Sequence, residues 1–250
     1  MSDIPELGGK TALVTGAGKR LGAAIATCLH EAGANVLLHF HRSQDAAATL
    51  CAAMNRNRDG SARVVRADIR NLAELPGLVA CALEAFGRLD ILVNNASTFY
   101  PTPLGEITPA DWDDLTGTNL RAPLFLSQAA ASHLRSTAGL ILNMVDIHAV
   151  RPLPDHPVYC VAKAGLMMLT RSLARELGPQ VRVNGIAPGP VLWPERELDP
   201  ELKSEIIGKT ALGRVGSPDD VARTALFLAR DAPYITGQII AVDGGRSIGW

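Results

Sequence analysis

Tyr159, Lys163 and Asp146 are the side chains whose types and spacing most directly suggest chemistry. Tyr159 and Lys163 lie four residues apart in "VYCVAKAG", so on a helix both would point from one face into the same small volume. An ammonium group near a phenol favours the phenolate, and we expect Lys163 to lower the pKa of Tyr159 toward a range useful for proton transfer. Asp146 ends the apolar run "LILNMV", although an unpaired buried carboxylate is costly. It either caps a turn after a strand or belongs to a site.

Seven short aliphatic or β-branched runs alternate with longer amphipathic stretches, and these elements must position the reactive side chains. The runs occupy residues 11–15, 35–40, 62–68, 89–96, 139–145, 181–187 and 237–245. The alternation is expected of βαβ units and predicts an α/β, doubly wound, Rossmann-like fold with a parallel sheet covered by helices on both faces. No linker, repeat or low-complexity tract interrupts the series, so we expect a single domain over residues 1–250.

One long excursion is predicted after the sixth run, at about residues 187–210. It begins with the Pro-rich stretch "APGPVLWPERELDP" at 187–200. Long loops in compact domains are usually lids or disordered segments, and open α/β sheets bind their ligands at the carboxyl ends of strands. We therefore expect a lid here, with Leu192 and Trp193 as substrate contacts.

A glycine-rich turn, "TGAGKRLG" at 15–22, joins the first run to a helix-like segment. Such a turn lets backbone N–H groups approach a pyrophosphate, although tight strand-to-helix turns also need glycine for steric reasons. The second run ends in "HFHRS" at 39–43, without the acid that binds a ribose hydroxyl in folds that prefer NAD. Arg42 and Ser43 can instead hold a 2′-phosphate, which favours NADPH; the alternative is a solvated basic loop.

The composition narrows the class of partner. The chain has 24 Lys and Arg against 25 Asp and Glu, so nothing suggests a nucleic acid or a charged membrane surface. No apolar run has the roughly 18 residues that a membrane span needs, and no His or Cys cluster has metal-ligand spacing. Four scattered cysteines are typical of free thiols in a reducing compartment. We expect a cytoplasmic protein that acts on a small molecule without a metal.

Over almost its whole length the chain resembles the short-chain dehydrogenase/reductase family. The resemblance rests on "TGAGKRLG", Asp68, "NNAS" at 94–97, Asn119, Tyr159 with Lys163, "PGP" at 188–190 and "VDGG" at 242–245. It implies a seven-stranded parallel sheet, a nicotinamide cofactor, hydride transfer and a homotetramer. Asn119, Tyr159 and Lys163 match the family's proton-relay positions.

Three positions depart from the common family pattern. The usual glycine two residues before Gly22 is Arg20, the serine expected 13 residues before the tyrosine is Asp146, and "NNAG" has become "NNAS", ending in Ser97. Together with "HFHRS", "NNASTFYPTPL" and "NMVDIHAVRPL", these departures resemble the pteridine reductases. That resemblance implies NADPH-dependent reduction of a pterin or folate ring.

The residue types fit such a ring, which is flat and has a hydrogen-bonding edge. Phe99 can stack on its face, while Arg20 can contact both a cofactor phosphate and a ring oxygen. Viewed alone, Phe99 is more often a core residue. Reducing a C=N bond requires a proton on nitrogen, and we hypothesise that Asp146 with Tyr159 supplies it. Lys163 would bind the nicotinamide ribose.

The predicted site is assigned as follows. Asp146, Tyr159, Lys163 and Asn119 are the catalytic residues, and Arg20, Ser97, Phe99, Asp146, Tyr159, Leu192 and Trp193 bind substrate. The NADPH contacts are Gly16, Lys19, Arg20, Leu21, His41, Arg42, Ser43, Asp68, Ile69, Asn95, Ala96, Ser97, Tyr159, Lys163, Pro188 and Gly189. His148 and His156 fall nearby, but lone loop histidines are usually solvated and neither is included.

Two other functions remain open. One is a carbonyl reductase of the same family, acting for instance on 3-oxoacyl thioesters. The other is a catalytically silent nucleotide-binding regulator, although a pure binding module has no need of the relay residues Asn119, Tyr159 and Lys163.

Overall fold

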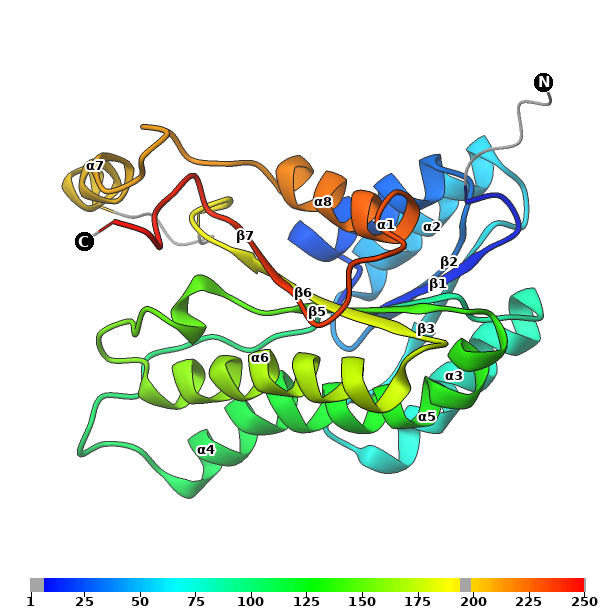
Figure 1. The fold of residues 1–250 in the computed structure, drawn as a ribbon, viewed down its shortest axis with the longest axis horizontal. Coiled ribbons are helices and arrows are strands. Elements are labelled where there is room, and N and C mark those ends of the chain that lie inside the picture. Colours follow the sequence, from blue (N-terminus) through cyan, green and yellow to red (C-terminus); the bar gives the residue numbers. More distant parts are fainter. Residues whose placement is uncertain (1–6, 194–198, 250) are drawn as a thin grey trace.

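The seven apolar runs form the strands of one parallel sheet (Figure 1). The computed structural model describes residues 7–193 and 199–249. Within them the strand order is β3-β2-β1-β4-β5-β6-β7, which confirms the predicted α/β fold. The strands are β1 (Thr11–Val14), β2 (Asn35–Phe40), β3 (Ala62–Arg66), β4 (Ile91–Asn94), β5 (Leu140–Met144), β6 (Arg182–Pro188) and β7 (Ile239–Val242).

Helices cover both faces of the sheet. The main ones are α1 (Arg20–Glu31), α2 (Gln44–Asn57), α3 (Leu75–Phe86), α4 (Pro109–Thr116), α5 (Ala122–Ser136), α6 (Pro157–Leu177), α7 (Pro200–Gly208) and α8 (Pro218–Arg230). Figure 1 shows α1, α2 and α8 on one face and α3, α5 and α6 on the other. Short helical turns are η1 (Leu72–Glu74), η2 (Gly117–Arg121) and η3 (Ile147–Ala149). None of the helices described is long and apolar enough to cross a membrane.

Alternate residues of the central strands pack into two separate hydrophobic cores. Val14 and Leu38 pack among the side chains of α1 and α8, whereas their neighbours Leu13 and Leu37 pack with α3 and α5. Because a strand's side chains point alternately to opposite faces, a strand covered on both sides must be apolar throughout. This explains why the sequence shows continuous apolar runs rather than alternation.

The sheet has a switch point between β1 and β4. β1 pairs with β2 on one side and with β4 on the other, with Val14 opposite Val93. The connections that leave the carboxyl ends of β1 and β4 therefore diverge to opposite faces and open a crevice, which is where open α/β sheets bind ligands. The glycine-rich turn and the "NNAS" segment both lie at this point.

The predicted excursion after β6 contains more regular structure than a loop. β6 continues to Pro188, and α7 occupies residues 200–208, at the end of the sheet where β6 and β7 finish (Figure 1). Asp199 begins α7 because its side chain accepts from the Glu201 N–H at 2.9 Å, and Pro200 suits the first turn. Residues 194–198 of the predicted lid lie outside the described residues.

Candidate active site

The glycine-rich turn after β1 has no room for side chains at two of its glycines. A Cβ on Gly22 would lie 2.3 Å from the Gly16 carbonyl oxygen, and a Cβ on Gly18 would lie 2.4 Å from Ser43 Oγ. Gly16 itself has φ +64°, a conformation that glycine adopts without strain. Glycine is therefore required at these positions by close packing within the turn and against Ser43.

Two side chains, the buried His39 and the half-buried Asn95, hold this turn in place. The imidazole of His39 bridges it to β3, because its Nδ1 accepts from the Gly16 N–H at 3.2 Å and its Nε2 lies 3.1 Å from the Ala67 carbonyl oxygen. These partners require the neutral imidazole with its proton on Nε2. Asn95, from the end of β4, donates to the Thr15 carbonyl at 2.8 Å. His39 was not among the predicted site residues, and its signal was a histidine inside an apolar strand.

Arg20 occupies the family's glycine position in the conformation that favours glycine. Its φ is +55°, which costs a side-chain-bearing residue about 1–2 kcal/mol. Its guanidinium Nη1 donates to the Trp193 carbonyl oxygen at 3.2 Å. Arg20 thus tolerates backbone strain while joining the glycine-rich turn to the segment after β6. Such strain concentrates at functional sites.

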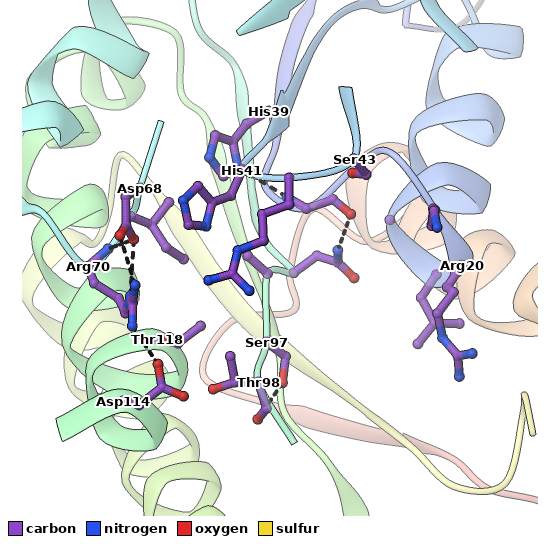
Figure 2. A pocket seen from close by; sticks show the side chains of 18 of the residues that line it. Arg20, His39, His41, Ser43, Asp68, Arg70, Ser97, Thr98, Asp114 and Thr118 are labelled. Atoms are coloured by element: carbon purple, nitrogen blue, oxygen red, sulfur yellow. Dashed lines mark hydrogen bonds and ion pairs between the residues drawn. The ribbon is translucent and has the colours of Figure 1, made fainter. Parts of the chain in front are cut away.

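A cavity of about 690 Å³ extends from the turn across the ends of β2 and β3 (Figure 2). His41, Arg42 and Ser43 line it at the end of β2. Asp68 lies opposite, after β3, and Arg70 binds both of its carboxylate oxygens and donates to Asp114 Oδ1 at 2.7 Å. Arg70 holds the pKa of the Asp68 carboxyl below its usual range. Because Arg70 is paired with these two carboxylates, it is not available to a ligand phosphate. Arg42 offers a cation and Ser43 a hydroxyl at the end of β2, and these groups are suited to a phosphate.

A second cavity of about 430 Å³ lies over the carboxyl ends of β5 and β6. It shares Arg20, Leu21, Asn95 and Ser97 with the first cavity, so the two are continuous along one wall. Tyr159 and Lys163 of α6 line it from one side and Asp146 from another. The two adjoining cavities could therefore hold a nucleotide and a second small molecule side by side.

Asp146 has both of the roles that the sequence left open. Its Oδ1 accepts from the His148 N–H at 2.8 Å and so caps η3, while its Oδ2 accepts from the Tyr159 hydroxyl at 2.8 Å. The cap fixes the carboxylate, and the second oxygen is free to meet the phenol. The local turn therefore positions the reactive group, and the buried carboxylate is satisfied.

The expectation that Lys163 lowers the pKa of Tyr159 is wrong for this structure. Burial of the phenol and the nearby Asp146 carboxylate raise that pKa well above its ordinary value. Lys163 Nζ lies 5.6 Å from the centre of the Tyr159 ring and donates instead to the Met144 carbonyl at 2.8 Å. Its own pKa is lowered to about 8 by burial, against a smaller opposing effect of Asp146. Tyr159 is accordingly a neutral phenol that donates a hydrogen bond.

Phe99 lines the second cavity, and one face of its ring stacks on a histidine. Its ring stacks on His156 with centroids 4.6 Å apart and an interplanar angle of 11°, and its edge meets Tyr159 at 4.8 Å. His156 does not line the cavity. Phe99 is 55% exposed, so it is a cavity wall rather than a core residue. The histidine that the sequence left aside packs directly on the proposed platform.

Most of the predicted site residues come together at the two cavities. All the predicted cofactor contacts line at least one of them, as do Phe99, Asp146 and Leu192. Trp193, predicted as a substrate contact, is not among the residues that line either cavity, and its backbone oxygen accepts a hydrogen bond from Arg20. Asn119 is 1% exposed and lines neither cavity. Wall residues that the sequence did not indicate include Arg70, Thr98, Tyr100, Asp114, Thr118, Met144, Val145, Ile147, His148, Pro190 and Val191.

The arrangement fits a dinucleotide beside a small polar substrate. The first cavity offers a glycine turn that excludes side chains and a cation at the end of β2, which are the features that a pyrophosphate and a phosphorylated ribose need. The second offers a phenol, a carboxylate and an aromatic face. A phenolic proton donor in a cavity that adjoins the first one is an arrangement compatible with hydride transfer from a dinucleotide.

Comparison with known proteins places the chain among oxidoreductases, the class that a dinucleotide site beside a proton donor indicates. A family model described as Enoyl-(Acyl carrier protein) reductase matches residues 16–247. The chain belongs to the short-chain dehydrogenase/reductase family and is an oxidoreductase of a family that uses nicotinamide cofactors.

Individual relatives differ in their substrates. Pteridine reductase 1 of Leishmania tarentolae is 40% identical, with 95% of this chain and 96% of that protein covered. 3beta-hydroxysteroid dehydrogenase 1 of Eggerthella lenta is 35% identical, with coverages of 97% and 95%. A 3-oxoacyl-(acyl-carrier-protein) reductase of Staphylococcus aureus is 34% identical, with coverages of 94% and 97%.

Proposed function

We propose that this protein is an NADPH-dependent pteridine reductase that transfers hydride to a pterin, dihydropterin or dihydrofolate ring to give the tetrahydro form. The observation that carries the proposal is the 2.8 Å hydrogen bond from the Tyr159 hydroxyl to Asp146 Oδ2 in a cavity that Phe99 also lines. The 40% identity to Pteridine reductase 1 supports it.

The proton chemistry favours a ring nitrogen as acceptor. Bound dihydronicotinamide supplies a hydride to the carbon of the C=N bond. Tyr159 stays protonated, because burial and Asp146 raise its pKa, and it can give its proton to the nitrogen. Asp146 orients the phenol and offers a carboxylate to N–H groups on the edge of the ring, which a serine hydroxyl cannot match in charge. Lys163, anchored on the Met144 carbonyl, is positioned for the nicotinamide ribose.

The ring would bind between the cofactor and Phe99. His156 covers one face of the Phe99 ring and does not line the cavity, so the substrate ring would stack on the other face. An offset stack on an aromatic face contributes about 0.5–1.5 kcal/mol beyond the area that it buries. Arg20 and Ser97 line both cavities and so can donate to the ring and to the cofactor.

NADPH is the proposed cofactor because of the end of β2. Arg42 and Ser43 line the cavity there, with no acid between His39 and Ser43. Arg42 can pair with a 2′-phosphate, whereas NADH would leave it unpaired. We expect Arg42→Ala to weaken NADPH binding by about 10- to 150-fold, on the basis of 1.5–3 kcal/mol for a hydrogen bond to a charged group, while NADH binding changes less than threefold.

One set of assays tests the function. Oxidation of NADPH is measured with fully oxidised pterin, dihydrobiopterin, dihydromonapterin and dihydrofolate, with NADH as the cofactor control and with Asp146→Ala and Asp146→Asn alongside. We expect turnover of at least one pterin with NADPH and a loss of 100-fold or more in kcat/KM for both variants, on the scale of general acid catalysis. The proposal fails if wild type reduces none of the four.

A carbonyl reductase is the second candidate. It is favoured by the 34% identity to the 3-oxoacyl reductase and by the Tyr159 and Lys163 pair, which serves carbonyl reduction equally well. It predicts that Asp146→Ser retains or improves turnover of a 3-oxoacyl thioester. Gain of that activity, with no pterin reduction by wild type, would favour this candidate over the first.

The family resemblance also leads us to propose a homotetramer in the cytoplasm. Leu124 of α5 and Val161 and Met168 of α6 are exposed apolar side chains, and a covered interface would explain them. The four cysteines are free thiols, as a reducing compartment would keep them. Light scattering that gives the mass of one or two chains would contradict the tetramer.

A further inference from the structure

His148 is a half-buried residue of the turn η3 and lines the second cavity together with Asp146. Its backbone N–H donates to Asp146 Oδ1 at 2.8 Å. The other oxygen of this carboxylate accepts from the Tyr159 hydroxyl at 2.8 Å. In the sequence His148 is an ordinary loop histidine, but the structure makes it a wall residue fixed directly beside the group that holds the phenol.

The hydrogen bond of the imidazole determines where its proton lies. Nδ1 of His148 lies 2.8 Å from the Arg151 carbonyl oxygen. A carbonyl oxygen only accepts, so Nδ1 carries the proton and Nε2 of the neutral ring is an acceptor. The Arg151 side chain is itself anchored, because its Nε donates to the Ser247 carbonyl at 2.8 Å. Nε2 has no hydrogen-bond partner among the residues that the structure describes, so it is the polar atom of this side chain that remains for a ligand.

Several other polar side chains of the second cavity already donate to protein groups. Lys163 donates to the Met144 carbonyl at 2.8 Å, and Ser97 donates to Asn119 Oδ1 at 2.6 Å. The segment after β6 adds only proline, glycine and aliphatic residues to the wall, namely Pro188, Gly189, Pro190, Val191 and Leu192. Nε2 of His148 therefore adds a free, neutral acceptor next to the Asp146 carboxylate.

The chemistry of a dihydropterin indicates which part of the substrate would meet this acceptor. The reducible bond of a 7,8-dihydropterin is N5=C6, where C6 takes the hydride and N5 takes the proton. The side chain of the pterin is attached to C6, so its first atoms must lie close to Tyr159 and Asp146 whenever the ring is placed for reaction. His148 is hydrogen-bonded to Asp146, and its side chain is therefore at the right place for the start of that substituent.

We propose that His148 is a specificity-determining residue that selects dihydropterins with a hydroxylated side chain, because its Nε2 accepts a hydrogen bond from the hydroxyl on the first side-chain carbon. The inference rests on the proposed pterin reduction and names its substrate class as hydroxyalkyl dihydropterins, such as dihydrobiopterin and dihydromonapterin. A substrate without this hydroxyl leaves Nε2 unpaired when the cavity is filled, and sites built to bind a hydroxyl discriminate against such analogues.

The test compares dihydrobiopterin with 6-methyl-7,8-dihydropterin, which has the same ring but a methyl group in place of the hydroxylated chain. Two variants separate the ring nitrogens. The amide of His148→Asn ends two bonds from Cβ, as Nδ1 does, and can keep the bond to the Arg151 carbonyl but has no group at the place of Nε2. The amide of His148→Gln ends three bonds from Cβ, as Nε2 does. Both variants keep the backbone N–H that binds Asp146.

We expect His148→Asn to lose about 5- to 10-fold in kcat/KM for dihydrobiopterin, as for one hydrogen bond. Its kcat/KM for the 6-methyl compound should stay within twofold of wild type, because that substrate never makes the bond. His148→Gln restores an acceptor and should stay within twofold of wild type for both substrates.

His156→Asn is the matched control. The Nδ1 of His156 also lies close to a carbonyl oxygen, that of Pro154 at 2.7 Å, but His156 does not line the cavity and stacks on Phe99 instead. Any effect of this variant comes through the stacked ring, which both pterins would share. It should therefore change kcat/KM for the two substrates by the same factor.

The outcomes distinguish this inference from the proposed function. A loss confined to dihydrobiopterin in His148→Asn, and absent from His148→Gln, supports the role of His148. Equal losses for both substrates in His148→Asn, no loss for either, or the same loss in both His148 variants would overturn that role, while reduction of the pterins by wild type would leave the function intact. If wild type reduces neither compound, the proposed function and this inference are both overturned.

Discussion

Arg20 offers the sharpest separation between backbone strain and ligand binding. Its φ of +55° costs about 1–2 kcal/mol, and Arg20→Gly relieves this strain but adds about 0.5–1 kcal/mol of chain entropy in the unfolded state. The exposed hydrogen bond to the Trp193 carbonyl contributes about 0.5 kcal/mol. These effects nearly cancel, so we expect Arg20→Gly to unfold within about 2 °C of wild type.

Arg20→Ala is the matched control, because it also removes the guanidinium but keeps the strained backbone. It should be about 1 kcal/mol less stable than Arg20→Gly, which corresponds to about 2–4 °C in Tm for a chain of this size. Both variants should weaken NADPH binding equally, by roughly 10- to 150-fold, if the guanidinium donates to a phosphate at 1.5–3 kcal/mol. Thermal unfolding followed by circular dichroism and NADPH titration by fluorescence measure the two effects.

Two results would refute this reasoning. Equal Tm values for Arg20→Gly and Arg20→Ala would show that the left-handed backbone at this position carries no strain. NADPH affinity within twofold of wild type in both variants would show that the guanidinium does not reach a phosphate, and Arg20 would then act only on the segment after β6.

Three further changes test other parts of the site. Burial lowers the pKa of Lys163 from 10.5 to about 8. Between these two pH values the unfolded chain binds more protons than the folded protein, so the free energy of unfolding should rise with pH, by up to about 3 kcal/mol. Urea titrations should show this rise in wild type and not in Lys163→Met. Burial also lowers the pKa of His39, so its neutral form supports the fold above pH 6.5, and the stability that wild type loses as the pH falls below 6.5 should be smaller in His39→Asn. His156→Ala removes the imidazole that stacks on Phe99 and should raise KM for the dihydropterin about two- to tenfold, on the scale of one aromatic pair. His156→Phe should restore the wild-type KM. An unchanged KM in both variants would mean that the stacking of His156 does not help Phe99 to bind substrate.

The sequence was sufficient for the fold because the central strands are buried on both faces. Each run, from 11–15 to 237–245, is continuous and largely apolar, and each became a strand of the sheet. Most strands end one or more residues inside the runs, as is usual for element boundaries, and the run residues beyond β4 and β7 include Asn95, Asp243 and Gly244 rather than further core side chains. The helix α7 within the excursion after β6 was harder to predict from the sequence. Asp199 and Pro200 form its start, but the several prolines of this stretch favour a loop.

The electrostatics of the site could not be read from spacing alone. Tyr159 and Lys163 share a helix face, as the four-residue spacing indicates, but which group dominates the phenol depends on which is closer to its oxygen. Asp146 is hydrogen-bonded to that oxygen, whereas Lys163 lies over the ring and donates elsewhere. A contact between β5 and α6 therefore reverses an expectation that was derived within α6.

The contributions of His39, Arg70 and His156 were missed for a related reason. Each has a partner far away in the chain: His39 contacts Gly16, His156 contacts Phe99, and Arg70 binds Asp114 in addition to its near neighbour Asp68. A motif search finds residues whose neighbours in sequence complete the pattern. It gives no signal for a side chain whose role depends on tertiary contact.

The departures at Asp146 and Ser97 are best understood as one rearrangement around Tyr159. The common family pattern places a hydroxyl after β5, 13 residues before the tyrosine, and a glycine at the end of "NNAG". In this chain the hydroxyl has moved to the end of β4, as Ser97, and a carboxylate stands after β5. The phenol gains an anionic neighbour, because its hydroxyl donates to Asp146. A carbonyl oxygen that develops negative charge would be repelled by that carboxylate, whereas an N–H edge would be held by it, and this supports the proposed reduction of a ring C=N bond.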